Sequence, residues 1–448
     1  MKVLIINRQY EGGGGAEAAV RRFMELLIAQ KHDVTLLALG HSNEIATQNH
    51  ALHRSSQPQI YTYHTVSSYF SEKLKFRLFH DRGIDGKIEN ENLHDLGDKR
   101  VVRGRQSFLN VLALRLLAFV SDWLTLAAPF RVYRLIQKLQ PDVVHTHNLR
   151  GMGMLMPLAI RFARCQHSVR KRGKNIRWYH TCHDIQLVEP SGVALYPAFE
   201  KHVPNIHDRA ILGYAFLQKC VWGSPDVVIS PSQFLIDFYR RYFFKSSEIK
   251  VIPNLIHLSK KEFQSDQLET TNQPHKYILF VGAIEESKGI RVLLDAYSLF
   301  QKNFQQKETP PLHIVGDGSL LPSLKQMYGS DTVIFHGPQP AEIVSKFYRE
   351  AIVTVLPSLT YENAPTVIME SMSEGVPVIA SRIGGIPELV QEGITGLLFT
   401  PGNNRELSDI LTSIVGVSQP SELRTHCQRE AITRSTRSTA SHTLFYSE

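Results

Sequence analysis

The sequence predicts an α/β protein built of two Rossmann-like domains that face each other across a cleft. Short β-branched runs alternate with longer helical patterns along most of the chain, which is typical of parallel β-α-β units. The chain has 448 residues, which is too long for one hydrophobic core. A polar, proline-bearing stretch over Ser265–His275 separates two series of predicted strands and marks a linker.

Each predicted strand is a short apolar or β-branched run. In the first series the strands are Lys2–Asn7, Asp33–Leu39, Asp142–His145, Ile176–Thr181, Asp226–Ile229 and Lys250–Ile252; in the second they are Tyr277–Val281, Leu312–Val315, Thr332–Phe335, Ile352–Leu356 and Val376–Ala380.

The domain boundaries follow from the linker. We expect a first domain over residues 1–256, a linker over 257–275 and a second domain over 276–418. Residues 419–448 are predicted to form a helical tail that packs back toward the first domain. Residues 42–105 have no clear period, and we expect an insertion or irregular excursion of the first domain there.

Charge is distributed unevenly along the chain. Residues 1–250 hold 34 Lys and Arg against 21 Asp and Glu, whereas the remainder holds 16 against 21. A basic first half is consistent with nucleic acid, an anionic membrane surface or a phosphate-bearing acceptor, and equally with an ordinary solvated surface. A membrane contact would involve the stretch Phe108–Phe130 or the basic run 170–174, although the first is more simply a buried helix.

The sequence favours a cytoplasmic protein. The first apolar run, within Lys2–Asn7, is too short for the core of a signal peptide. Phe108–Phe130 is interrupted by Arg115 and Asp122 and makes a poor spanning helix. The four cysteines are scattered without a CxxC pair, so we expect reduced thiols.

Polar motifs follow the predicted strands, where ligands of open parallel sheets bind. After the first strand, the glycines that end in Gly14-Gly15 precede a helix and can present backbone amides to an anion. This is not a GxGxxG fingerprint, and no acidic residue ends the second strand, so a nicotinamide oxidoreductase is disfavoured. His145 and His147 lie on one face of a strand, and His183 and Asp184 follow the next one. These histidines suggest a polar site without requiring a metal, or else are satisfied structural residues.

The second domain carries more specific motifs. Gly282 follows its first strand, and Lys288 comes a short loop later, where it can meet a diphosphate. Gly316 closes the next strand in a tight turn. Pro365 suits the first turn of a helix, so Glu362 precedes that helix and Glu370 lies about two turns inside it.

The segment between these two glutamates, Asn363-Ala364-Pro365-Thr366, offers free backbone amides near a helix start, a natural seat for a phosphate. Glu370 lies in an apolar stretch, where burial without a partner would be costly. A ribose diol would be a suitable partner for that carboxylate.

In this order, the motifs resemble glycosyltransferase family 4, a retaining family with the GT-B fold. The resemblance covers nearly the whole chain: GGAE at Gly14–Glu17, DVVHTH at Asp142–His147, ISPS at Ile229–Ser232, IPN at Ile252–Asn254, KG at Lys288–Gly289, E-x7-E at Glu362 and Glu370, and GGIPE at Gly384–Glu388.

The resemblance implies a hexosyltransferase-type enzyme that moves a sugar with retention from a nucleotide-diphosphate donor to a glycan or lipid-linked acceptor, as in polysaccharide biosynthesis. It implies catalytic roles for His147, Glu362 and Lys288. Donor binding would fall to Gly14, Gly15, Gly282, Lys288, Gly316, Asn363, Ala364, Pro365, Thr366 and Glu370, with His183 and Asp184 on the acceptor side. It also implies no cofactor, no metal and no nucleic-acid partner, and the chain has no DxD triplet.

The chain departs from the family at Ala283, where an arginine usually partners the lysine on the diphosphate. Arg8 or Arg382 could replace that cation. Two alternatives to a transferase stay open: a GT-B-type nucleotide-sugar epimerase or phosphorylase, and a non-catalytic binding protein of the same fold.

Overall fold

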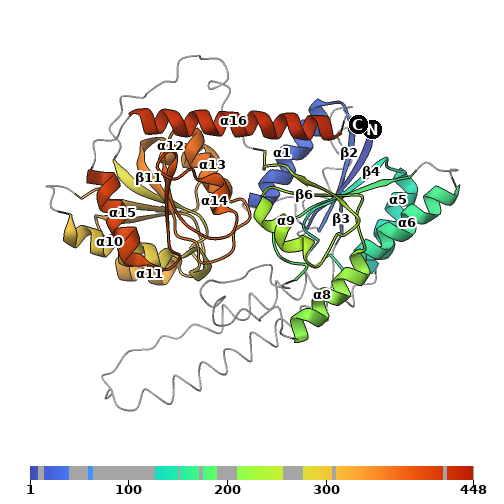
Figure 1. Cartoon of the computed structure of the whole chain (residues 1–448), viewed down its shortest axis with the longest axis horizontal. Helices are drawn as coiled ribbons and strands as arrows, with labels where there is room; N and C mark the ends of the chain where they lie inside the picture. The colour runs from blue at the N-terminus through green and yellow to red at the C-terminus, as the bar shows by residue number, and fades with distance from the viewer. Residues whose placement is uncertain are drawn as a thin grey trace, which may run out of the picture.

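The computed structural model describes residues 1–8, 15–39, 59–63, 127–149, 152–170, 175–188, 209–255, 276–304, 309–416 and 421–446. Gly14, the linker 257–275, the run 171–174 and most of Phe108–Phe130 lie outside these residues. The described chain forms two parallel sheets with helices on their faces, side by side in Figure 1. The predicted α/β class with two parallel-sheet domains is confirmed.

The first sheet has seven strands in the order β3-β2-β1-β4-β5-β6-β7. These are β1 (Lys2–Ile6), β2 (Asp33–Leu39), β3 (Gln59–Tyr63), β4 (Val143–Thr146), β5 (Arg177–Thr181), β6 (Val227–Ser230) and β7 (Glu248–Val251). Its helices are α1 (Gly15–Ala29), α5 (Ala127–Leu139), α6 (Met156–Arg170), α8 (Arg209–Trp222) and α9 (Gln233–Arg240).

The second sheet has six strands in the order β10-β9-β8-β11-β12-β13. These are β8 (Tyr277–Val281), β9 (Leu312–Val315), β10 (Val333–Gly337), β11 (Ala351–Leu356), β12 (Val378–Ser381) and β13 (Gly396–Phe399). Its helices are α10 (Ile290–Asn303), α11 (Leu321–Tyr328), α12 (Ala341–Glu350), α13 (Thr366–Ser373), α14 (Ile386–Leu389) and α15 (Asn404–Gly416).

Both sheets are covered on both faces, which explains why their strands are continuous apolar runs. In β1, Leu4 and Ile6 pack into one core, while Val3 and Ile5 pack into a second core on the opposite face. Alternate side chains of a strand point to opposite faces, so the run fills two cores at once. The strand β8 divides its residues in the same way.

Two strands lie outside the predicted set. β3 falls in the segment 42–105, which was predicted as irregular, and it pairs with β2 over Thr35–Leu39. β13 has only four residues, begins with a glycine and pairs with β12. Each depends on its neighbouring strand for stability and carries a weak local pattern of its own.

The helix α16 (Ser421–Phe445) runs along both domains (Figure 1). It packs against α13 of the second domain. Near its other end, Ser438 Oγ donates to the carbonyl of Pro253 at 2.6 Å, and Gln30 Nε2 donates to Thr443 Oγ1 at 2.8 Å. One continuous helix therefore contacts both domains. In the part of the chain that the structure describes, no helix is long and apolar enough to cross a membrane.

Candidate active site

The carboxyl ends of the two sheets meet at a set of contacts between the domains. A Cβ atom at Gly15, the first residue of α1, would lie 3.5 Å from both Cγ2 and Oγ1 of Thr366, the first residue of α13. Two helix N-termini from different domains therefore lie close together. Their free amides and dipoles favour an anion beside them.

Asn363, just before α13, joins the domains. Its amide nitrogen donates to the carbonyls of Cys182 (3.1 Å) and His183 (3.2 Å), and its amide oxygen accepts a short hydrogen bond from Ser232. Asn254 donates to the carbonyl of Ala364 at 3.3 Å. The side chain of Asn363, predicted to bind a donor, is thus engaged in holding the domains in register.

Lys288 and Glu362 form an ion pair. Lys288 Nζ lies 2.5 Å from Glu362 Oε1, which also accepts hydrogen bonds from Ser358 (2.7 Å) and Thr360 (3.4 Å). Only 30% of the lysine side chain and 15% of the glutamate side chain are exposed. The structure thus brings together two residues predicted separately as catalytic, and it leaves both charges neutralised before an anion arrives.

A glycine makes this pairing possible. The 3₁₀ turn η1 (Glu286–Lys288) ends at Gly289, whose φ is +69°. A Cβ atom there would lie 1.8 Å from the carbonyl oxygen of Pro357. The loop carrying Lys288 can therefore approach the loop that leads to Glu362 only because residue 289 lacks a side chain.

Gly282 and Gly316 lie at the ends of β8 and β9. A Cβ atom at Gly316, where φ is +143°, would lie 1.9 Å from the carbonyl oxygen of Gly282. The structure therefore assigns Gly316 a packing role, whereas a donor-binding role for the two glycines stays a prediction. Ala283, where the family usually has arginine, follows directly and is exposed.

Glu370 has a partner that the sequence did not indicate. Arg22 of α1 approaches it across the domain boundary, with Nη2 3.7 Å from Glu370 Oε1, while its Nη1 donates to the carbonyl of Leu255 at 3.0 Å. The hydroxyl of Tyr348 donates to Glu370 Oε2 at 3.4 Å. Burial and the neighbouring Glu370 raise the pKa of Tyr348 well above its ordinary value, so the phenol stays a donor.

Of the two cations predicted to compensate for Ala283, Arg382 donates from Nη2 to both carboxylate oxygens of Glu392, at 2.8 and 2.9 Å. Arg8 donates its backbone N–H to the carbonyl of Asn148 at 2.8 Å. Instead, Arg22 is the first-domain cation that the structure brings against a predicted donor-binding carboxylate. Its sequence signal is weak, because an arginine within an amphipathic helix is usually solvated.

His147 follows β4 and is 3% exposed. Its Nδ1 lies 3.0 Å from Nε2 of His183, and its ring stacks on that of His145 at 4.2 Å between centroids. Its Nε2 is buried without a hydrogen-bond partner in the described residues. Burial and the adjacent histidines lower the pKa of His147 well below its ordinary value, and burial lowers that of His183 to about 4. Both rings are therefore neutral near pH 7.

Asp184 orders the loop after β5. Its carboxylate accepts from the backbone N–H of Gln186 at 2.9 Å and from Asn148 Nδ2 at 3.5 Å, and its carbonyl accepts from the hydroxyl of Tyr239 at 2.7 Å. An acceptor-side role for Asp184 stays a prediction. Within the described residues, no group of three or more His, Cys, Asp or Glu side chains is arranged to hold a metal ion.

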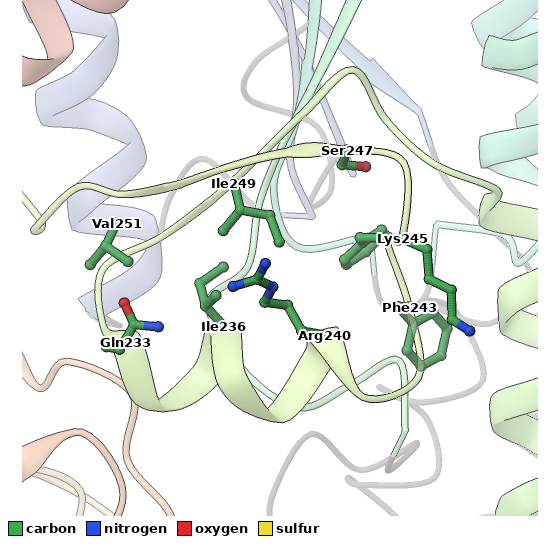
Figure 2. A pocket seen from close by; sticks show the side chains of 9 residues that line it. Gln233, Ile236, Arg240, Phe243, Lys245, Ser247, Ile249 and Val251 are labelled. Carbon is green, nitrogen blue, oxygen red and sulfur yellow. The ribbon is translucent and has the colours of Figure 1, made fainter.

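A separate pocket of about 570 Å³ lies between α9 and β7 at the edge of the first sheet (Figure 2). Ile236, Ile249 and Phe243 contribute apolar walls, and Arg240 and Lys245 contribute two cations. Neither cation has an ion pair or side-chain hydrogen bond with another described residue. The pocket contains none of the predicted site residues.

Two parallel-sheet domains, with the N-termini of α1 and α13 in contact at their junction, define a two-domain class of α/β protein. The chain matches the family model "Glycosyl transferase 4-like domain" over residues 14–255 and "Glycosyl transferases group 1" over residues 261–434. It belongs to this glycosyltransferase family.

Solved structures agree on the fold, which is GT-B. Sucrose-phosphate synthase from Thermosynechococcus elongatus superposes with a TM-score of 0.62 at 18% identity, covering 100% of both chains. Anabaena HepE in complex with UDP-glucose gives 0.60 at 17% identity, covering 100% of this chain and 99% of that one.

Sequence relatives match over shorter segments. The amylovoran biosynthesis glycosyltransferase AmsK of Erwinia amylovora is 31% identical over 163 residues, which is 34% of this chain and 39% of that protein. The sulfoquinovosyl transferase SQD2 of Arabidopsis thaliana is 30% identical over 159 residues, 34% of this chain and 29% of that protein. The matched segments thus span about two fifths or less of these relatives.

Proposed function

We propose that this protein transfers a sugar, with retention, from a nucleotide-diphosphate donor to a glycan or lipid-linked acceptor. The observation that carries the proposal is the meeting of the α1 and α13 N-termini beside the Lys288–Glu362 pair. Helix N-termini and a lysine are groups that stabilise a diphosphate, which supports a donor site at this junction. The Anabaena structure contains UDP-glucose, a donor of this chemistry.

The proposed chemistry is electrostatic and needs no metal. The acceptor hydroxyl forms the new bond to the sugar on the face from which the diphosphate departs, and its proton passes to the departing phosphate oxygen. Cleavage of the sugar–phosphate bond leaves negative charge on the diphosphate, and Lys288, having left Glu362 for the phosphate, stabilises that charge. Glu362, released from the lysine, is then free to bind donor sugar hydroxyls. Glu370 holds the ribose beside Arg22. His147 contacts the donor sugar, and the acceptor approaches from the side of His183 and Asp184.

A panel of nucleotide sugars, each assayed for nucleotide release with and without candidate acceptors, tests this function. We expect nucleotide release from one donor to accelerate when a glycan or lipid-linked acceptor is added. The sugar should be recovered on that acceptor in its original anomeric configuration. Turnover that yields an epimerised nucleotide sugar would instead indicate an epimerase, and phosphate-dependent turnover a phosphorylase. Binding of a nucleotide sugar without turnover under all conditions would favour a non-catalytic protein.

We also propose that the first domain contacts the inner surface of an anionic membrane from the cytoplasm. The basic balance of residues 1–250 supports this, and so does the α9–β7 pocket, where Arg240 and Lys245 lie beside apolar walls. A lipid headgroup phosphate with its acyl chain matches that combination, at about 1 kcal/mol for each cation near the surface.

Sedimentation with anionic liposomes at low salt tests the membrane contact. We expect the wild type to co-sediment, and the double variant Arg240→Ala/Lys245→Ala to bind several-fold less. The matched control is Lys302→Ala/Lys325→Ala, which removes two exposed charges from the second domain. Equal recovery of the wild type with neutral and anionic liposomes would contradict the proposal.

A further inference from the structure

The end of the chain reaches the strand that carries His145 and leads to His147. Tyr446 follows α16 directly and is 3% exposed, in the core beneath α1 with Phe23 and Tyr179 around its ring. Its hydroxyl lies 2.6 Å from Nδ1 of His145, a separation of 301 residues along the chain. A buried phenol needs such a partner, so this contact fixes where the helix ends.

His145 is held at both of its ring nitrogens. While Tyr446 occupies Nδ1, the Oγ1 of Thr181 on the adjacent strand β5 lies 2.8 Å from Nε2. The imidazole is 1% exposed, and it cannot rotate about its side-chain bonds without breaking a buried hydrogen bond. The ring of His145 therefore has a fixed orientation for the side chain that packs on it.

His147 packs on that ring. The two imidazoles stack with 28° between their planes, and Phe23 covers both rings, at 5.1 Å from His145 and 5.8 Å from His147. His183 binds Nδ1 of His147 from the other side. The direction in which the unpartnered Nε2 of His147 points thus depends on the stack as well as on His183.

The same helix contacts the opposite domain. α16 packs against α13, which carries Glu370, and Arg424 near its start donates to the carbonyl of Ala351 at 3.2 Å. The helix therefore connects the predicted donor-binding domain to the stack of His145 and His147.

We propose that Tyr446 is a positioning residue for His147, acting through His145. Its hydroxyl orients the His145 ring, which sets the orientation of His147 toward the donor sugar. The inference rests on the proposed function, because it assigns His147 a contact with substrate. A group displaced from its productive geometry lowers the rate more than it lowers binding.

A purely structural role for Tyr446 would be to anchor α16, and the chain offers a matched control for that role. Ser438 also donates one hydrogen bond from α16 to the first domain, to the carbonyl of Pro253, and no contact joins its side chain to His145 or His147 in the described residues. Tyr446→Phe and Ser438→Ala each remove one such bond. Only the first removes a bond to His145.

We expect Tyr446→Phe to lower kcat roughly three- to tenfold, the scale of one buried hydrogen bond, with the donor KM nearly unchanged. Ser438→Ala should leave kcat unchanged, and both variants should show comparable small decreases in melting temperature. In side-chain ¹⁵N spectra of histidine-labelled protein, the ring signals of both His145 and His147 should shift in Tyr446→Phe, whereas the His147 signals should not shift in Ser438→Ala.

Equal kcat in the two variants, or His147 signals that do not move in Tyr446→Phe, would overturn the positioning role. The spectra need no turnover, so they decide the inference even if the wild type transfers no sugar. A failure of the proposed function appears separately, as a wild type that gives no transfer product from any donor.

Discussion

Lys288→Met is expected to lower kcat by about 10²- to 10³-fold, the loss seen when one preorganised group that stabilises developing negative charge is removed. Methionine keeps most of the side-chain volume, so packing under the 3₁₀ turn changes little. The variant has no charge to meet the diphosphate. It also leaves the largely buried carboxylate of Glu362 with Ser358 and Thr360 as its partners among the described residues, and that carboxylate would then repel the donor.

Two further variants separate these effects. In Lys288→Met/Glu362→Gln the repulsion is gone, so donor binding should recover partly while kcat stays low. Lys276→Met is the control: Lys276 pairs with Glu350 at 3.5 Å in the same domain, with 55% of its side chain exposed, and its loss should not change kcat. A kcat in Lys288→Met within twofold of the wild type would refute the role given to Lys288.

Glu370→Ala is expected to weaken binding of the nucleoside diphosphate by about 1.5–3 kcal/mol, the scale of hydrogen bonds to a charged group. Calorimetry with UDP or GDP, chosen by the donor panel, measures this loss directly. The loss in kcat should be smaller than for Lys288→Met, because the ribose lies away from the bond that breaks.

The ribose diol proposed as the partner of Glu370 can be tested directly with a nucleotide that lacks it. A 2′,3′-dideoxy diphosphate should bind the wild type more weakly than the ribonucleotide does, and Glu370→Ala should bind the two with nearly equal affinity. Glu374→Ala is the control, since Glu374 caps the same helix but pairs with Ser345 and Arg349. If Glu370→Ala still bound the dideoxy diphosphate more weakly than the ribonucleotide, another group would be the one that binds the ribose.

Much of the fold could be predicted from local pattern. Continuous apolar runs such as Val3–Ile6 identify strands buried on both faces, and the polar motifs after them mark the carboxyl ends of the sheets. There the structure brings Gly15 against Thr366 and pairs Lys288 with Glu362. Pro365 predicts the start of α13 at Thr366. The strands β3 and β13 could not be found in this way, because their stability depends on pairing with a neighbour.

The sequence by itself determined which residue types stand at the strand ends and helix starts, because backbone propensity and hydrophobic period act over a few neighbouring residues. Only the tertiary structure decided their partners: Glu362 for Lys288, Arg22 for Glu370 and Tyr446 for His145. These contacts join residues far apart in the chain, the first by 74 positions and the last by 301. Such pairs form only when distant segments of the chain pack together, within the second domain for Lys288 and Glu362 and between the domains for the other two, so no local sequence pattern specifies them.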